Sequence, residues 1–150
     1  MTAGIVGVGY QGATAAGLAG WLADSGVGTL VDVRLTPLSR KPGFSKRAWA
    51  DILREHGIGY LHLPALGNPK DNRAGFADAP ETPAGREARD RYRALLRTEP
   101  ASAALGEIAA LAAEQRVALL CFEQSEDHCH RAEVLRAVRA RLEGPTGAAT

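Results

Sequence analysis

Short apolar runs alternate along this chain with longer segments in which apolar residues return every three or four positions. A continuous apolar run predicts a buried strand, and the wider spacing predicts a helix with one buried side. The runs predict strands over residues 5–8, 29–33, 58–63 and 117–122. The periodic segments predict helices over about residues 14–25, 46–56, 82–98, 102–115 and 130–143. This alternation predicts an α/β fold, with a mainly parallel central sheet of four to five strands and helices on both faces.

The same spacing indicates which large side chains belong in the core. Leu18, Trp21 and Leu22 fall on one side of the first predicted helix, and Trp49 lies with Leu53 on one side of the second. We therefore expect both tryptophans to be buried.

The predicted elements form one domain over residues 1–143, followed by a small, polar tail over residues 144–150 that we expect to fray. Residues 64–83 are rich in Gly, Pro, Asn and Asp and predict a long loop, of the kind that often forms a functional lid. Thr82 and Pro83 then predict the cap and first residue of the next helix.

Composition narrows the class of protein. Apolar residues make up 45% of the chain and charged residues 23%, which is ordinary for a soluble globular domain. The chain has no apolar run of membrane-spanning length, and its first residues lack the pattern of a secretion signal. We expect a cytoplasmic protein with no membrane partner, whose two cysteines stay as thiols.

The net charge and the absence of nucleotide-binding motifs limit the kinds of partner and cofactor expected. A formal net charge of +1 argues against a dedicated nucleic-acid binder, so nucleic acid is the weaker candidate partner. The glycines near the first strand do not have the dinucleotide-binding spacing, and no phosphate-binding loop of the GxxxxGK[ST] type occurs. The sequence therefore identifies no cofactor and says nothing about oligomeric state.

Polar residues stand where the predicted strands end. Tyr10 follows the first strand in a glycine-rich turn, Asp32 and Arg34 end the second, His62 ends the third and Cys121 the fourth. The carboxyl ends of parallel strands share one edge of a sheet, and ligands of such folds bind there. These residues therefore predict a single cleft. Within it, His62 fits a packed histidine better than a general base.

The stretch from residue 121 to residue 131 concentrates reactive groups. It holds Cys121, Glu123, Cys129, His130 and Arg131. The positive end of the helix predicted to start here favours a thiolate or a bound anion. Cys121 is equally well explained as a small core residue, whereas Cys129, at the helix start beside His130 and Arg131, fits that explanation less well. A zinc site using His128 as well is a further alternative, but no C-x-x-C pair is present, so we assign no metal ligand.

A basic segment over residues 34–47 contains no acid. It includes Arg34, Arg40, Lys41, Lys46 and Arg47, and Ser39 adds a hydroxyl. Such a loop suits a phosphate-like anion. A solvated loop, with an Asp32–Arg34 ion pair holding it, is the alternative. Arg131 has the same two explanations: it holds an anion, or it pairs with Glu123 or Asp32.

Five segments, in order along the chain, carry a resemblance to a known family. They are Gly7-Val-Gly-Tyr-Gln-Gly12, Leu30-Val-Asp-Val-Arg34, residues 36–45, residues 57–68, and Cys121-Phe-Glu with Cys129-His-Arg131. The chain resembles the bacterial and archaeal domain-of-unknown-function 488 family, whose activity is not established. The resemblance implies the fold and the place of the site. The family often has His or Tyr-Glu where this chain has Tyr10-Gln11, and many relatives end with one more strand.

The sequence favours a cysteine-dependent enzyme acting on an anionic, phosphate- or nucleotide-like small molecule. Cys121 or Cys129 is the candidate nucleophile, and His130 is either its base or the partner that lowers its pKa. Arg34, Arg40 and Arg131 hold the anion, while Tyr10, Ser39 and Glu123 orient it. Thiol transfer, redox chemistry and hydrolysis all stay open. A non-catalytic nucleotide or nucleic-acid binding module and a zinc-stabilised domain are the alternatives.

Overall fold

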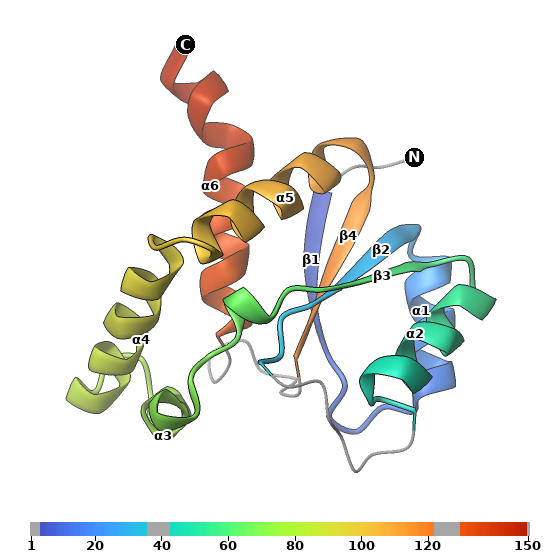
Figure 1. The fold of residues 1–150 in the computed structure, drawn as a ribbon, viewed down its shortest axis with the longest axis horizontal. Helices are drawn as coiled ribbons and strands as arrows, with labels where there is room; N and C mark the ends of the chain where they lie inside the picture. Colours follow the sequence, from blue (N-terminus) through green and yellow to red (C-terminus); the bar gives the residue numbers. More distant parts are fainter. Residues whose placement is uncertain (1–3, 36–42, 122–129, 150) are drawn as a thin grey trace.

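The computed structural model describes residues 4–35, 43–121 and 130–149. Four strands form a parallel sheet in the order β1-β4-β2-β3 (Figure 1). The strands are β1 (Gly4–Gly9), β2 (Val27–Asp32), β3 (Gly59–His62) and β4 (Arg116–Cys121). The helices are α1 (Ala15–Asp24), α2 (Lys46–Glu55), α3 (Arg73–Ala77), α4 (Pro83–Leu96), α5 (Ala101–Glu114) and α6 (Arg131–Ala149). The predicted α/β fold is confirmed, with four strands in the described residues.

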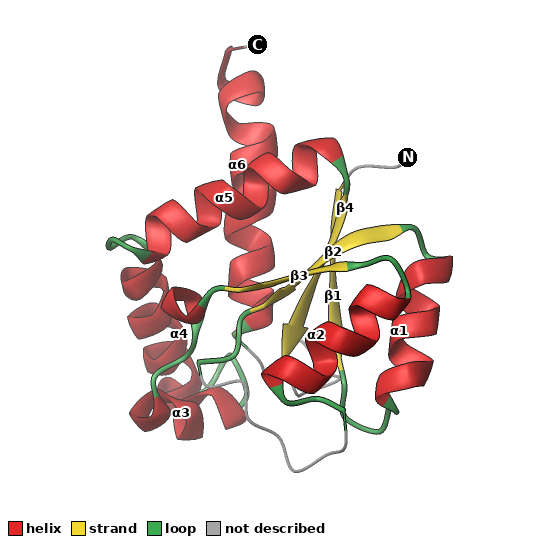
Figure 2. Cartoon of the chain, turned by 45° about the vertical axis from the view of Figure 1, so that its right-hand side comes forward, coloured by secondary structure: helices red, strands yellow, loops and turns green. Residues whose placement is uncertain are grey.

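The sheet separates two apolar layers. Helices α1 and α2 cover one face, and the helices that follow β3 cover the other (Figure 2). Because strand side chains alternate, Val117 and Leu119 of β4 point toward the helices that follow β3, whereas Ala118 and Leu120 point toward α1 and α2. All four are fully buried. This explains why β4 reads as a continuous apolar run rather than an alternating one.

Two helix starts are capped by a threonine side chain, one of them the predicted Thr82, whereas the start of α2 has no side-chain cap. The hydroxyls of Thr14 and Thr82 accept hydrogen bonds from backbone N–H groups of α1 and α4, and Pro83 opens α4. Ser45 stands at the cap position of α2 without a side-chain cap hydrogen bond. Helix α6 continues to Ala149, beyond its expected end at Glu143. None of the helices in the described ranges is long and apolar enough to cross a membrane.

The expectation that residues 64–83 form an open loop is wrong. This segment contains two short 3₁₀ turns, Pro64–Leu66 and Lys70–Asn72, and helix α3. Helix α4 holds it in place: the Tyr92 hydroxyl donates to Leu66 O at 2.5 Å, and Asn72 donates to Ala88 O at 2.9 Å. Buried Arg89 donates to Phe76 O. These long-range bonds satisfy the backbone of a segment that has little regular structure of its own.

One of the two tryptophans expected in the core is exposed. Trp49 is fully buried between α2 and the sheet, whereas 54% of Trp21 is exposed. Leu18 and Leu22 occupy the inward positions of α1. Trp21 precedes Leu22 by one residue, which is about 100° around a helix, so it turns to the side of α1.

The close packing of α3 on α4 leaves no room for a side chain at Gly75. A Cβ added to Gly75 would lie 2.5 Å from the Cβ of buried Ala88. We expect Gly75→Ala to lower the free energy of unfolding by about 1–3 kcal/mol through this overlap. Gly106→Ala, in the exposed middle of α5 with nothing within 4 Å of the added carbon, should raise it by about 0.5–1 kcal/mol. Urea denaturation of both variants measures the difference, and equal effects would contradict the packing argument.

Candidate functional site

The ends of the four strands meet at one edge of the sheet. Gly9 pairs with Cys121, and Asp32 pairs with Leu120 on one side and with His62 on the other. This register places the residues that follow β1 and β2 beside the ends of β3 and β4. The edge is therefore where several of the sequence-derived candidates come together.

An ion pair between Asp32 and Arg34 lies at the centre of this edge. The Asp32 side chain is fully buried and Arg34 is 7% exposed. Arg34 Nε donates to Asp32 Oδ1 at 2.8 Å and Nη2 donates to Oδ2 at 2.6 Å, so the contact is bidentate. The Arg34 backbone N–H also donates to Oδ1. The two side chains share a face of their strand end, as their alternate positions predict.

The remaining donors of Arg34 bond to residues outside its own strand, including Phe44 near the end of the basic segment. Nη1 donates to Phe44 O at 2.6 Å and contacts the Tyr10 hydroxyl at 3.4 Å. The Phe44 ring in turn stacks on Tyr10, with 4.4 Å between ring centroids. With these contacts and those to Asp32, four of the five guanidinium N–H groups face protein acceptors. The contacts favour the alternative in which Arg34 holds its loop rather than grips an anion.

Tyr60, which was not among the residues predicted from the sequence, completes this network. Its hydroxyl donates to Asp32 Oδ2 at 2.5 Å, so the carboxylate accepts from Tyr60 as well as from Arg34. Burial and the bond to Asp32 raise the pKa of Tyr60 above its ordinary value. The strand register could have pointed to Tyr60. Leu30 pairs with Tyr60, two positions before the Asp32–His62 pair, and residues two positions apart in a strand lie on the same side of the sheet.

Two histidines are tied to backbone carbonyls at the same edge. His62 Nε2 lies 2.8 Å from Arg34 O, and His130 Nε2 lies 2.8 Å from Val33 O. A carbonyl only accepts, so His130 carries its proton on Nε2 and its lone pair on Nδ1 when neutral. The Tyr92 ring meets the His130 ring edge-on at 5.3 Å. Burial lowers the pKa of His130 to about 4, and the charges of Arg73 and Arg131 contribute to the lowering.

Arg131 opens α6 from a fully buried position, with 1% of its surface exposed. Its neighbour in the first turn, Glu133, accepts from Arg93 of α4 through both carboxylate oxygens, at 2.7 and 3.2 Å. This bond, which raises the pKa of Arg93, fixes the start of α6 against α4. Helix α6 thereby positions His130 and Arg131 at the sheet edge.

Several candidates lie outside the described residues. These are Ser39, Arg40, Glu123 and Cys129. Cys121 is placed by its backbone as the last residue of β4. Within residues 4–35, 43–121 and 130–149, no group of three His, Cys, Asp or Glu side chains is arranged to hold a metal ion.

The family comparison covers most of this architecture. The model described as Domain of unknown function DUF488 matches residues 15–138, from the start of α1 into α6. A search of curated proteins found no match, and a search of solved structures found none. The matched segment includes Asp32, Arg34, His62, Cys121 and His130 and extends over far more than half of the sequence. The chain therefore belongs to the DUF488 family.

Proposed function

We propose that the protein is a thiol-dependent enzyme that acts on an anionic small molecule at the carboxyl edge of the sheet. In this proposal Cys121 is the nucleophile and His130 is the base that takes its proton. The thiolate attacks an electrophilic atom of the substrate, and a covalent bond to sulfur forms as the bond to the leaving group breaks. The proton that His130 took from the thiol passes to the leaving group.

The observation that carries the proposal is the anchoring of His130 beside the end of β4. Val33 N–H donates to Leu120 O at 3.3 Å, and Val33 O accepts from His130 Nε2 at 2.8 Å. Val33, which directly follows β2, thus links the imidazole to the strand end at which Cys121 follows Leu120. Because this bond holds the proton on Nε2, the basic nitrogen is Nδ1.

The charges around His130 support the same proposal. Arg73 and Arg131 each lower the pKa of His130, and Asp32 opposes them. A positive potential that disfavours the imidazolium also favours a thiolate or an anionic substrate at this edge. With a pKa of about 4, His130 is neutral at pH 7 and keeps its lone pair on Nδ1, but it is a weak base. In this proposal the positive charges of Arg73 and Arg131 therefore have to stabilise the thiolate for the proton transfer to proceed.

Alkylation rates test this proposal. We expect iodoacetamide to modify one thiol with an apparent pKa below the ordinary value of about 8.5. Cys121→Ser should abolish the fast phase and Cys129→Ser should retain it, with mass spectrometry identifying the labelled peptide. His130→Gln should slow the fast phase, because the proton acceptor is lost. Two thiols that both react slowly and titrate near the ordinary value would refute the proposal.

A further inference from the structure

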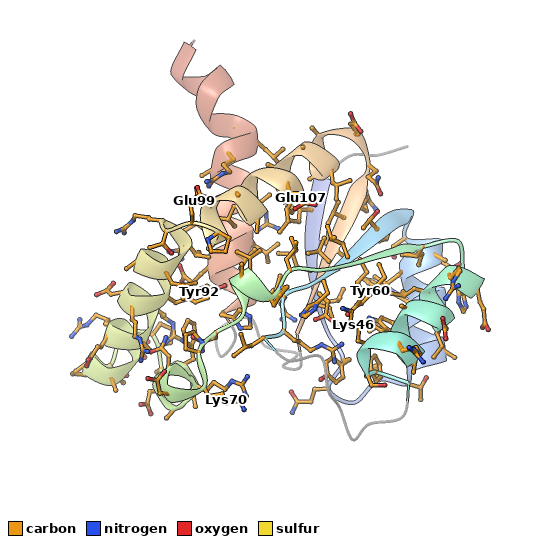
Figure 3. All side chains as sticks on the ribbon, in the orientation of Figure 1. Lys46, Tyr60, Lys70, Tyr92, Glu99 and Glu107 are labelled. Atoms are coloured by element: carbon orange, nitrogen blue, oxygen red, sulfur yellow. The ribbon has the colours of Figure 1, made fainter. Side chains whose placement is uncertain are left out.

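A groove runs along the outer side of α2, next to the edge strand β3. Its volume is about 620 Å³, and it is lined by Lys46, Arg47, Ala50, Asp51, Arg54 and Tyr60. Figure 3 shows the labelled side chains of Lys46 and Tyr60 close together in that view, one from α2 and the other from β3. The groove begins at the first turn of α2, which follows the segment leaving the carboxyl edge of β2.

Helical spacing explains the shape of the groove. Lys46, Ala50 and Arg54 stand four residues apart and lie in one row along α2. The small side chain of Ala50 leaves a hollow between the two long cationic ones. Arg47 and Asp51 form the adjacent row.

The groove carries an excess of positive charge. Asp51 pairs with Arg54 as an exposed contact three residues apart, which leaves no acid in the lining for Lys46 and Arg47. Neither of these two side chains makes an ion pair with any residue that the structure describes. Two cations next to each other, in a chain of net charge +1, favour an anion with more than one acceptor oxygen.

Tyr60 gives the groove a rigid aromatic wall. Its hydroxyl is held by buried Asp32, which the bidentate contact to Arg34 fixes in turn. The ring is therefore anchored from inside the protein and loses little freedom when a ligand packs against it. An immobilised aromatic ring beside paired cations suits a phosphate joined to a planar group, because a planar base gains binding energy by stacking on an aromatic ring.

We propose that this groove binds a nucleoside monophosphate, with the phosphate between Lys46 and Arg47 and the base against Tyr60. We infer further that this nucleotide is the anionic substrate of the proposed thiol enzyme. Its catalytic relevance rests on that proposed function, whereas binding itself does not require the thiols.

Isothermal titration of the full chain with AMP, adenosine and inorganic phosphate tests the site. We expect AMP to bind at least about tenfold more tightly than either fragment, which corresponds to about 1.4 kcal/mol. Lys46→Ala/Arg47→Ala should weaken AMP binding by at least about tenfold. The control Arg86→Ala/Arg97→Ala removes two exposed charges, one on α4 and one at the residue after its end, and should leave the affinity unchanged.

Three outcomes would overturn the groove assignment: no AMP binding, phosphate binding as tight as AMP, or equal losses in both double variants. Cys121→Ser/Cys129→Ser should retain AMP binding, which separates the two proposals. AMP binding with ordinary thiols refutes the thiol enzyme and leaves the groove intact. An activated thiol without AMP binding refutes the groove assignment and supports the thiol enzyme.

Discussion

Asp32→Asn should lower the free energy of unfolding by about 3–5 kcal/mol, because it leaves the Arg34 guanidinium buried without a counter-charge. The carboxylate is fully buried and accepts from Arg34 and Tyr60. Asparagine has nearly the same shape, so the loss comes from charge and hydrogen bonding rather than from a cavity. Chemical denaturation followed by circular dichroism measures the effect.

Asp51→Asn is the matched control for this substitution. It removes the acid of another Asp–Arg pair, in which the side chains of Asp51 and Arg54 are 57% and 75% exposed. Solvent screens that pair, so we expect a change of less than about 1 kcal/mol. The double variant Asp32→Asn/Arg34→Met should recover stability relative to Asp32→Asn, because it removes the stranded charge. A small loss for Asp32→Asn, similar to that of the control, would show that the buried pair does not stabilise the edge.

Acid should destabilise the protein through His130, by up to about 3 kcal/mol between pH 6.5 and about pH 4. Burial lowers the pKa of His130 to about 4 in the folded chain, so the unfolded chain takes up this proton first. The contribution is therefore fully present above about pH 6.5 and is lost as the pH falls toward 4. His130→Gln should flatten the stability profile in this window.

An NMR titration of the His130 ring gives the direct measurement. We expect a midpoint near pH 4, and Arg73→Ala should move it upward, because the charge of Arg73 contributes to lowering the pKa. Arg86→Ala removes an exposed arginine of α4 and should leave the midpoint where it is. A midpoint near the ordinary value of about 6.5 would contradict a buried imidazole surrounded by positive charge.

Replacing Asp32 and replacing His130 should affect different properties of the proposed enzyme. Asp32 and Arg34 act as a clamp that fixes Tyr60 and the Phe44 end of the basic segment. Their loss should weaken ligand binding in the α2 groove through Tyr60, without any contact of their own to the ligand. His130, by contrast, faces the chemistry itself in our proposal, and its replacement should change thiol reactivity more than AMP affinity.

Local pattern was enough to predict most of the architecture. Apolar runs located all four strands to within about two residues, and helical spacing located five of the helices. Side-chain alternation placed Asp32 and Arg34 on one face, and the parallel order brought the strand ends together. These features depend on residues that are neighbours in the sequence or on rules shared by all parallel sheets.

Contacts between distant residues decided the rest. Tyr60 bonds to a carboxylate 28 positions earlier, and His130 bonds to a carbonyl 97 positions earlier. Trp21 is exposed because Leu18 and Leu22 take the inward positions of α1, and residues 64–83 are ordered by hydrogen bonds from α4.

The sequence alone therefore determined the elements, their parallel arrangement and the edge at which polar residues gather, because periodicity and strand direction are local properties. Only the tertiary structure decided that Arg34 is held by protein acceptors, that Tyr60 is anchored beside two cations, and that His130 is neutral. Each of these depends on burial and on partners supplied by other elements, which no local pattern encodes.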